Sequence, residues 1–406
     1  MGAGFSPANP MPRILQIARS VTGGLRRYLE VLLRTLRESG AEVHLAASPI
    51  PEDRFRTFVR SQEAAGVVFH PIPMSRPFWP WADLRATAAI FRILRAGRFD
   101  AVHTHAAKAG LVGRLASAVA RVPVVFHTPH GLRTNEPGLV GTAARLIERI
   151  GSPFTTRLVA VSDGERDLAI RSGIDPRKIL VARNGIPSPA VASTGEEGLR
   201  SKVQGPTSAE SLTSDLRLST LDLRPAPSDC LFGSAGRFCR QKSFGRLVEA
   251  AGILSRRGGR ARFVLAGEGP LESDLRAAAG REDLAGRFEF LPWQADVPAF
   301  LSGLDAFALP SRFEGLPFSL LESMAAGVPP VASDIPGVSE VVEDGRSGLL
   351  VPSQDPAALA DALGRLEREP ALRRSLGEGA RRRVADWFRE DGMIADLRRA
   401  YSNVLG

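Results

Sequence analysis

Residues 13–46 read RILQIARSVTGGLRRYLEVLLRTLRESGAEVHLA, and two hydrophobic patterns in this stretch decide the fold class. Residues 13–18 and 42–46 are short apolar runs of the kind that form buried strands. Between them, residues 24–39 carry arginines on one helical face and leucines on the other, namely Leu25, Leu29, Leu32, Leu33 and Leu36. A strand, a helix and a second strand in this order predict a βαβ unit with parallel strands.

The same alternation continues in two blocks separated by a polar stretch. Strands are predicted in the first block also at residues 67–72, 101–104, 122–127, 157–161 and 178–182, and in the second block at 230–236, 263–266, 288–290, 306–309, 330–333 and 348–351. Amphipathic segments between strands indicate parallel sheets covered on both faces. We therefore predict an α/β protein with two Rossmann-like, doubly wound parallel-sheet domains that face each other across a cleft.

The polar stretch sets the domain boundaries. Residues 188–229 are rich in Ser, Thr, Gly and Pro, which is typical of a linker or insertion. The first domain is then 1–187 and the second 230–387, and an amphipathic helix over about 388–406 is expected to complete the first domain. Because such sheets bind ligands at the carboxyl ends of their strands, we expect the site in the cleft.

The composition is that of a soluble globular protein of 406 residues with a net charge of +9. Its two cysteines, Cys230 and Cys239, are too few for a disulfide framework and favour a reducing compartment. The sequence shows neither an apolar run of roughly 20 residues nor the apolar core of a signal peptide. We therefore expect a cytoplasmic protein, and the charge favours an anionic partner: nucleic acid, an anionic membrane surface or a phosphorylated substrate.

Residues 311–327, SRFEGLPFSLLESMAAG, place two glutamates around the start of a predicted helix. Pro317 suits a helix start, so Glu314 lies in the preceding turn and Glu322 inside the helix. Backbone N–H groups at a helix start are unpaired and bind anions. Those groups belong here to Gly315, Leu316 and Phe318. A carboxylate beside them is well placed to accept hydrogen bonds from sugar hydroxyls; the alternative is that both glutamates are surface charges.

In each domain, the loop that follows the first strand is a further candidate for ligand binding. Residues 236–242, GRFCRQK, contain Arg237 and Lys242, which together could neutralise a diphosphate; the alternative is a solvated basic loop. In the first domain, the tandem Gly23 and Gly24 allow the backbone to approach a ligand closely, and the alternative is an ordinary tight turn. This loop is not the G-x-G-x-x-G of dinucleotide-binding proteins.

Four of the six histidines cluster at residues 103, 105, 127 and 130. His103 and His105 share one strand face, so zinc must be considered, but no nearby cysteine or carboxylate completes a ligand set. We expect no metal site. His130, at a strand end before Gly131, is expected to face the cleft, and the other three are expected to make buried hydrogen bonds.

These segments, in this order, resemble family 4 glycosyltransferases of the GT-B fold, a group of retaining enzymes. Glu314 and Glu322 match the E-x7-E element of the family. Further matches are GRFCRQK, LAGEGP (265–270), VAVSDGERD (159–167), RNGIP (183–187) and the TGG loop. HTHAAKAGLVGRLA (103–116) with HTPHG (127–131) is similar to the subgroup that acts in bacterial surface polysaccharide assembly. The resemblance covers nearly the whole chain apart from residues 188–228.

The resemblance implies a nucleotide-sugar donor, with a UDP-sugar favoured over GDP-mannose, and a glycan or polyprenyl-diphosphate-linked acceptor. Arg237 and Lys242 would hold the diphosphate, Glu322 the ribose, and Glu314 the transferred sugar. The other implied donor-binding residues are Gly23, Gly24, Gly267, Glu268, Pro292, Trp293, Gly315, Leu316, Pro317 and Phe318. The implied catalytic residues are His130, Glu314, Arg237 and Lys242, and further cleft candidates are His127, Ser162 and Asn184.

The resemblance also implies metal-free and cofactor-free catalysis, in which side-chain cations and a helix start stabilise the leaving diphosphate. One departure from the family pattern touches this loop, because Ser243 stands where a glycine is usual. A GT-B-fold sugar-nucleotide epimerase or a non-catalytic sugar-nucleotide-binding protein remains an alternative. A nicotinamide oxidoreductase would need a Gly-rich fingerprint that is missing, and no nucleic-acid-binding module is recognisable.

A peripheral association with the inner face of the membrane is a further hypothesis. The aromatic loop PFWPW (77–81) and a helix with Arg26, Arg27, Arg34 and Arg37 would suit an anionic lipid surface. The alternative is an ordinary solvated arginine-rich face.

Overall fold

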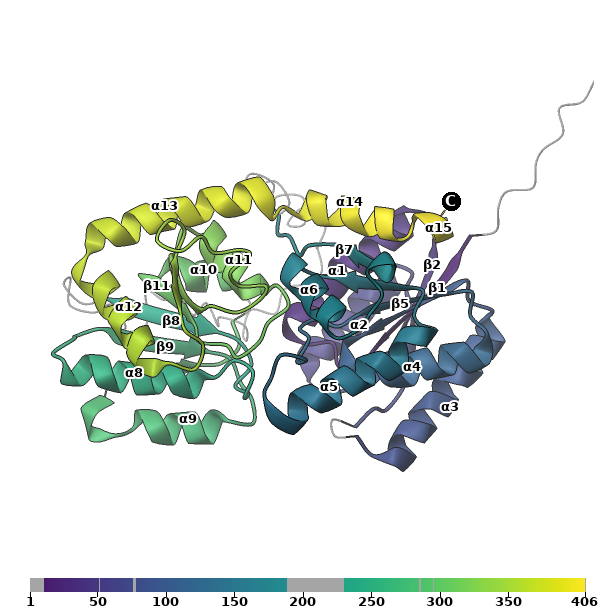
Figure 1. The fold of residues 1–406 in the computed structure, drawn as a ribbon, viewed down its shortest axis with the longest axis horizontal. Coiled ribbons are helices and arrows are strands. Elements are labelled where there is room, and N and C mark those ends of the chain that lie inside the picture. The colour runs from purple at the N-terminus through teal and green to yellow at the C-terminus, as the bar shows by residue number, and fades with distance from the viewer. Residues whose placement is uncertain are drawn as a thin grey trace, which may run out of the picture. The chain divides into compact units, whose positions relative to one another are not determined.

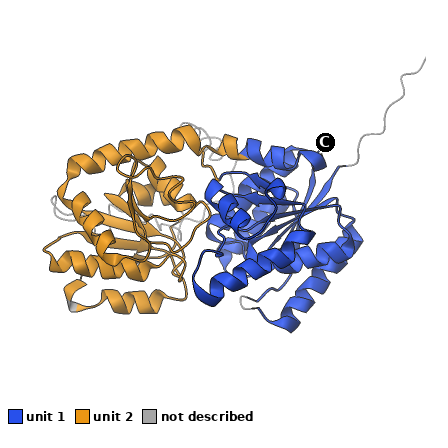
Figure 2. Ribbon diagram, viewed as in Figure 1, with its two compact units in different colours: residues 1–183, 394–406 blue, residues 184–393 orange. Residues whose placement is uncertain are grey.

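The computed structural model describes residues 11–50, 52–75, 78–187, 230–284, 286–294 and 296–405. The chain forms two compact units, one of residues 1–183 with 394–406 and the other of residues 184–393 (Figure 2). These limits lie a few residues from the boundaries predicted at 187 and 388. The segment 188–229, predicted to be a linker or insertion, lies outside the described residues.

The first unit is built on a seven-stranded sheet with the order β3-β2-β1-β4-β5-β6-β7, in which all neighbouring strands are parallel (Figure 1). Its strands are β1 (Arg13–Ala18), β2 (Glu42–Ala47), β3 (Val68–Pro71), β4 (Ala101–His105), β5 (Val124–Thr128), β6 (Arg157–Ala160) and β7 (Ile179–Val181). Its helices are α1 (Gly23–Glu38), α2 (Asp53–Ala64), α3 (Pro80–Gly97), α4 (Ala106–Ala120), α5 (Gly138–Gly151) and α6 (Asp163–Arg171), with short 3-10 turns at Ser152–Phe154 and Pro176–Lys178.

Helix α1 shows why the opening stretch of sequence forms this layer. Leu29, Leu32, Leu33 and Leu36 are buried against the sheet, and Leu25 is half-buried. The central strand β1 is buried on both faces, because helices cover both sides of the sheet. The stripe of leucines and the apolar strand thus bury each other, as the periodicity predicts.

The second unit contains a six-stranded parallel sheet with the order β10-β9-β8-β11-β12-β13. Its strands are β8 (Leu231–Ala235), β9 (Arg262–Ala266), β10 (Phe288–Leu291), β11 (Ala306–Leu309), β12 (Pro330–Ser333) and β13 (Leu349–Val351). The helices are α8 (Phe244–Arg256), α9 (Glu272–Ala279), α10 (Val297–Ser302), α11 (Phe318–Ala325), α12 (Pro356–Arg368) and α13 (Pro370–Trp387), with a 3-10 turn at Glu282–Leu284. A buried apolar core joins the sheet to α8 and α12.

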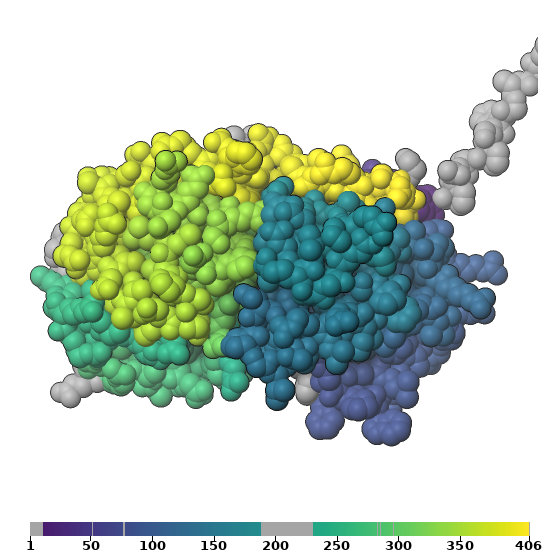
Figure 3. All heavy atoms as spheres, viewed as in Figure 1, coloured from purple at the N-terminus to yellow at the C-terminus, as the bar shows by residue number. Residues whose placement is uncertain are grey.

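The end of the chain returns to the first unit. The single helix predicted over 388–406 is wrong in detail, because the structure has α14 (Glu390–Ala400) and α15 (Ser402–Leu405), separated by the buried Tyr401. Figure 3 shows this C-terminal end, in yellow, on the surface of the first unit. No helix of the described residues is both long and apolar enough to span a membrane.

The strand order of each sheet reverses at one place, between β1 and β4 in the first unit and between β8 and β11 in the second. At such a switch point the connections leave the sheet in opposite directions, so the carboxyl ends of the two strands are free to bind a ligand. The predicted fold class of two Rossmann-like, doubly wound parallel sheets is confirmed. Each switch point is therefore the place to look for functional side chains.

Candidate functional site

The switch point of the second unit brings together two loops that are far apart in the sequence. The loop after β8 carries Lys242, and the loop after β11 carries Glu314. The Nζ atom of Lys242 donates to Oε1 of Glu314 over 2.8 Å. Only 14% of the lysine side chain and 6% of the glutamate side chain are exposed, so this ion pair is largely screened from water. Two residues predicted to bind the donor thus form one site.

Glu314 is held by neutral donors as well. Ser311 donates through Oγ to Oε1 of Glu314 over 2.7 Å, and Gln241 donates through Nε2 to Oε2 over 3.2 Å. The backbone of Gln241 also binds the loop after β11, because the backbone carbonyl oxygen of Gln241 accepts from the N–H of Arg312 over 2.9 Å. Ser311 and Gln241 were not among the predicted site residues, although both are polar and lie inside the segments 311–327 and 236–242. They fix the carboxylate and hold the two loops together.

Ser243, the departure from the family pattern, follows directly after Lys242. It lies in the left-handed region with φ of 54° and ψ of 34°, where glycine is unstrained. For another residue this conformation costs about 1 kcal/mol. The hydroxyl of Ser243 contacts Oε1 of Gln354 over 3.3 Å, which anchors the strained turn at the start of α8.

The remaining donor-site predictions of this unit fall at the same edge of the sheet. Gly267 and Glu268 follow β9, and Pro292 and Trp293 follow β10. Gly267 has a φ of 146°, and a Cβ atom there would overlap the carbonyl oxygen of Gly236, so the backbones after β8 and β9 pack closely. Glu268, Pro292 and Trp293 are exposed. Since parallel strands all end at one edge, these residues lie along the side of the sheet that carries Lys242 and Glu314.

Helix α11 begins just after Glu314, and its start lacks a side-chain cap. The N-cap residue is Pro317, which offers no side-chain acceptor to the first amide groups. Residues 314–318 are buried, which includes the predicted Gly315, Leu316 and Phe318. Glu322 is half-buried in the second turn, and Arg237 is exposed in the loop after β8. An uncapped helix start beside a lysine is an electropositive place suited to phosphate.

Asn184 belongs to this second unit and supports the same loop. Its side chain is buried and donates through Nδ2 to the carbonyl oxygen of Leu316 over 2.7 Å. The other amide atom, Oδ1, is buried without a hydrogen-bond partner among the described residues. The structure therefore places this predicted cleft residue directly behind the turn that leads into α11.

In the first unit, the tandem glycines follow β1 and so lie at the switch point of the sheet. Helix α1 begins at Gly23, which has a φ of 56°, and both Gly23 and Gly24 are exposed. The N-cap Thr22 makes no side-chain hydrogen bond to the helix start. The first turn of α1 thus also presents backbone amide groups to solvent.

His127 is the next-to-last residue of β5, and its side chain lies in the interior of the unit. It is completely buried, and its Nδ1 lies 2.9 Å from Oγ1 of Thr104, while Nε2 lies 3.5 Å from Glu148. Arg114 completes this interior cluster through a 3.1 Å bond to Glu148. Burial by itself raises the pKa of Glu148, but His127 and Arg114 lower it below its usual range. His127 makes the buried contacts expected of these histidines, and its prediction as a cleft candidate is wrong, because its side chain is completely buried inside the unit.

His130 follows β5 with a φ of 57° and is partly exposed. Its loop is fixed by Glu165, which was not among the predicted site residues. The N–H groups of Gly131 and Val161 donate to the Glu165 carboxyl over 2.5 and 2.9 Å. Burial raises the pKa of Glu165 to about 7. Ser162 caps α6 by accepting from the N–H of Glu165 over 2.9 Å, so its hydroxyl serves the helix start rather than facing outward.

No group of three or more His, Cys, Asp or Glu side chains in the described ranges is arranged to hold a metal ion. The ring nitrogens of His103 and His105, which raised the question of zinc, instead bind protein groups. His103 contacts Tyr401 and Thr128, and His105 contacts Gln16 and His130.

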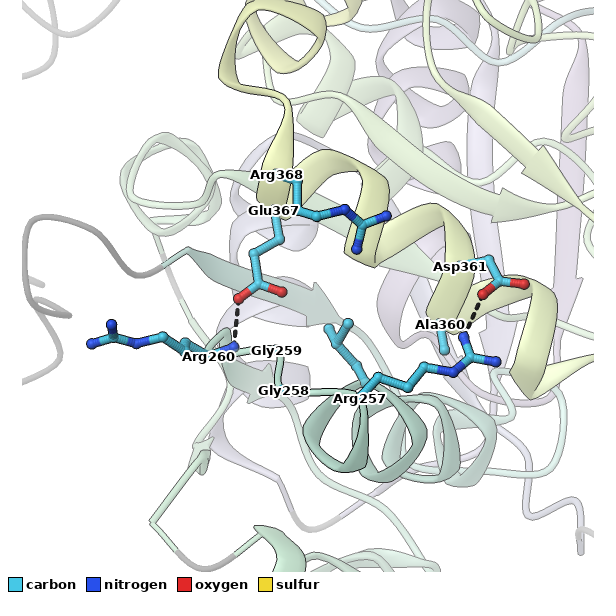
Figure 4. A pocket seen from close by; sticks show the side chains of 9 residues that line it. Arg257, Gly258, Gly259, Arg260, Ala360, Asp361, Glu367 and Arg368 are labelled. Carbon is cyan, nitrogen blue, oxygen red and sulfur yellow. Dashed lines mark hydrogen bonds and ion pairs between the residues drawn. The ribbon is translucent and has the colours of Figure 1, made fainter.

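A pocket of about 450 Å³ lies elsewhere on the second unit (Figure 4). It is lined by the end of α8, the turn before β9 and one face of α12. There Arg257 pairs with Asp361, and Glu367 accepts from the backbone N–H of Arg260 over 2.6 Å. Because α8 ends and β9 begins there, the pocket is at the amino edge of the sheet, opposite Lys242 and Glu314. It is not part of the candidate site.

Both units match families of known proteins. Residues 223–383 match the family described as Glycosyl transferases group 1, and residues 23–185 match the family described as Glycosyl transferase 4-like domain. A D-inositol 3-phosphate glycosyltransferase of Salinispora tropica is 30% identical over 94% of this chain and 81% of its own length. The UDP-Gal:alpha-D-GlcNAc-diphosphoundecaprenol alpha-1,3-galactosyltransferase of Escherichia coli is 28% identical over 75% of this chain and 76% of its own.

Among solved structures, Anabaena Alr3699/HepE in complex with UDP-glucose shares the fold, with a TM-score of 0.73 and 18% identity over 96% of this chain and 99% of its own. The two Rossmann-like units, the two family matches and the relative at 30% identity agree with one another. The chain belongs to the family 4 glycosyltransferases of the GT-B fold and is a glycosyltransferase.

Proposed function

We propose that this glycosyltransferase moves a sugar from a UDP-sugar to a lipid-linked or polysaccharide acceptor, with retention of the anomeric configuration. The observation that carries the proposal is the buried pair of Lys242 and Glu314, set at the switch point of the second sheet next to the uncapped start of α11. A cation, a carboxylate and free amide groups in one place suit a diphosphate joined to a sugar.

The lysine can serve both the glutamate and a donor. An ammonium group carries three N–H donors, and Glu314 takes one of those of Lys242. The other two are available for phosphate oxygens. With Arg237, which lies exposed in the same loop, Lys242 would bind the diphosphate and stabilise it as it leaves. Glu314 and Glu322 would bind hydroxyls of the sugar and the ribose.

The transfer step follows from these roles. The bond between the anomeric carbon and the phosphate oxygen breaks, and its electron pair stays with the diphosphate. The acceptor oxygen forms a new bond to the same face of that carbon, through an oxocarbenium-like transition state. The acceptor proton passes to the departing phosphate oxygen, so the step balances without an external base. Cationic side chains and a helix start would neutralise the developing charge without a metal ion.

The choice of donor and acceptor draws on the relatives. The name of the Escherichia coli relative specifies UDP-galactose and a GlcNAc-diphosphoundecaprenol acceptor, and Alr3699/HepE was solved with UDP-glucose. A UDP-sugar and an acceptor of the polyprenyl-diphosphate class are therefore the first candidates for this chain, in the assembly of a cell-surface polysaccharide. GDP-mannose carries the same diphosphate and is the alternative donor.

A transfer assay tests the proposal. The purified protein is incubated in EDTA with UDP-glucose, UDP-galactose, UDP-N-acetylglucosamine or GDP-mannose and a short-chain GlcNAc-diphosphate-polyprenol, and the lipid product is analysed by mass spectrometry and NMR. We expect a glycosylated lipid with one UDP-sugar, and an anomeric coupling constant showing retention. An inverted product, or a product formed only with added divalent metal, would contradict the mechanism.

We also propose that the first unit rests on an anionic membrane at the cytoplasmic face. Helices α3, α4 and α5 pack side by side, and α3 and α5 both begin at the carboxyl edge of the sheet. Exposed apolar side chains gather on these two helices and just before α3, namely Phe78, Trp79, Trp81, Leu84, Leu139, Val140 and Leu146. Trp81 is 78% exposed and Leu139 is 88% exposed. The arginines predicted on α1 contribute less to membrane binding, because Arg26 and Arg27 pair with Glu30.

Replacing both Trp81 and Leu139 with serine is expected to weaken vesicle binding at least tenfold, because each buries apolar area in the lipid. Flotation with vesicles of equal parts phosphatidylcholine and phosphatidylglycerol measures the binding. Val119→Ser is the matched control, since Val119 is 70% exposed at the other end of α4. Equal flotation of all three proteins, or none by the wild type, would contradict the membrane proposal.

A further inference from the structure

A chain of buried polar side chains connects the C-terminal end of the protein to His130. Gln16 on β1, His103 and His105 on β4, and Tyr401 are each completely buried. Register explains why they meet, since β1 pairs with β4 so that Gln16 lies opposite His103. Both tyrosines of the chain, Tyr28 and Tyr401, pack against this histidine cluster.

The hydrogen bonds of this cluster form one continuous path within the first unit. Gln16 donates through Nε2 to Oη of Tyr401 over 3.2 Å, and its Oε1 lies 2.9 Å from Nε2 of His105. The Nδ1 of His105 lies 3.1 Å from Nε2 of His130. On the other side, Oη of Tyr401 lies 2.6 Å from Nδ1 of His103. The Nδ1 of His130 makes no hydrogen bond to any of the described residues.

The direction of each bond follows from what each atom can do. An amide oxygen only accepts, so Nε2 of His105 must carry the hydrogen that reaches Gln16. A neutral imidazole has a single N–H, so Nδ1 of His105 is an acceptor. The hydrogen between the two rings therefore sits on Nε2 of His130, and Nδ1 of His130 keeps a free lone pair.

The phenol fixes the start of this sequence. Oη of Tyr401 accepts from Nε2 of Gln16 over 3.2 Å, so the amide oxygen of Gln16 is turned toward His105. The contacts of His103 with Tyr401 and Thr128 join groups that can each donate or accept. The rings are neutral, since burial and the neighbouring histidines lower the pKa of His105 and burial and His127 lower that of His130 to about 3.

We propose that Gln16, His105 and Tyr401 are positioning residues that hold His130 in the Nε2–H tautomer, and that Nδ1 of His130 accepts a hydrogen bond from a sugar hydroxyl of a substrate. The statement about the sugar hydroxyl rests on the proposed function. The hydroxyl belongs either to the donor sugar or to the acceptor, and both present the same chemistry. The C-terminal segment thus acts on His130 through Gln16 and His105, without contact with the substrate.

Long-range proton–nitrogen NMR of ¹⁵N-histidine-labelled full-length protein at pH 7.5 tests the tautomer without any ligand. His130→Asn identifies the His130 signals. In the wild type we expect a bare Nδ1 and a protonated Nε2. In Gln16→Ala and Tyr401→Phe the two nitrogen shifts are expected to move toward each other, because both tautomers become populated. Tyr401→Phe keeps the ring that packs on Phe126 and removes only the hydroxyl.

Thr104→Val is the matched control, because Thr104 lies on β4 between His103 and His105 but binds His127 on the other face of the sheet. It should leave the His130 shifts unchanged. A wild-type His130 protonated on Nδ1, or shifts that stay the same in both Gln16→Ala and Tyr401→Phe, would overturn the tautomer assignment.

The same spectra test whether Nδ1 of His130 accepts a hydrogen bond from a sugar hydroxyl. Saturating UDP-glucose, UDP-galactose or UDP-N-acetylglucosamine is compared with UDP, and separately the GlcNAc-diphosphate-polyprenol is added. An Nδ1 shift with a UDP-sugar but not with UDP assigns the hydroxyl to the donor, and a shift with the lipid assigns it to the acceptor. If the Nδ1 shift stays the same with every one of these compounds, the proposed hydrogen bond from a sugar hydroxyl is overturned. If no UDP compound binds the wild type, the proposed function fails, while the tautomer result stands on its own.

Discussion

Replacing Lys242 with alanine is expected to lower kcat/KM for sugar transfer by about a hundred- to a thousandfold. The reason is the position of Nζ, 2.8 Å from Glu314 at the switch point and next to the start of α11. Removing a preorganised cation beside a leaving group raises the transition-state energy much more than that of the bound donor. Steady-state kinetics with the donor identified by the transfer assay measures the loss.

The control for this variant must separate catalysis from stability. Losing Lys242 leaves a largely buried carboxylate without its cation, which by itself destabilises the fold. Thermal unfolding is therefore recorded alongside the kinetics at a temperature where the variant stays folded. Arg246→Ala, in the first turn of α8, removes a partly exposed cation that pairs with Glu249 and should retain wild-type rates. A folded Lys242→Ala protein with wild-type kcat/KM would show that the lysine is only structural.

Acidification from pH 6.5 toward 5 is expected to destabilise the first unit steeply. Burial lowers the pKa of five histidines of the first unit below the usual value, namely His70, His103, His105, His127 and His130. Below pH 6.5 the unfolded chain binds more protons at these positions than the folded chain does, so the free energy of unfolding falls as the pH falls. Glu165 opposes this, because its raised pKa lets the folded state bind one extra proton between about pH 7 and its ordinary value of 4.5.

The histidines whose pKa lies well below the usual value, His103, His105 and His130, take up three protons in the unfolded chain, and Glu165 takes up one in the folded chain, which leaves a balance of two protons. Each corresponds to about 1.4 kcal/mol per pH unit, which gives roughly 3 kcal/mol per unit in this window. Hydrogen exchange of the β4 and β5 amides, corrected for intrinsic rates, measures the opening free energy of the first unit separately from that of the second. His130→Asn should reduce the slope by about 1.4 kcal/mol per pH unit. An opening free energy that is constant between pH 6.5 and 5 would refute this prediction.

The sequence predicts the sheets well because their pattern is local. Buried parallel strands read as short apolar runs, and the leucine spacing of α1 follows from its contact with the sheet. The tandem glycines, the basic loop and the two glutamates could be placed at strand ends for the same reason. Which of these loops meet depends on strand order, and the pairing of Lys242 with Glu314 follows only once β8 and β11 are known to be neighbours.

The supporting residues were harder to predict, because their partners are distant in sequence. Asn184 reaches Leu316, and Tyr401 reaches Gln16 and His103 across almost the whole chain. The burial of His127 inside the unit could have been predicted from the alternation of side chains along its strand. Side chains alternate between the faces of a strand, so His127 must lie on the face opposite to Thr128. The structure places Thr128 beside His103 and His127 beside Thr104 on the other side.

We expect the second unit to bind a nucleotide diphosphate at Lys242 and Glu314 without a metal ion. Calorimetric titration of the full chain with UDP, GDP and ADP in EDTA measures this binding, with Lys242→Ala and Arg246→Ala beside the wild type. UDP is expected to bind the wild type and Arg246→Ala equally well in EDTA and to bind Lys242→Ala at least tenfold more weakly, because Lys242→Ala loses a charge-assisted hydrogen bond. Binding that requires added magnesium, or UDP affinity that is unchanged in Lys242→Ala, would contradict it.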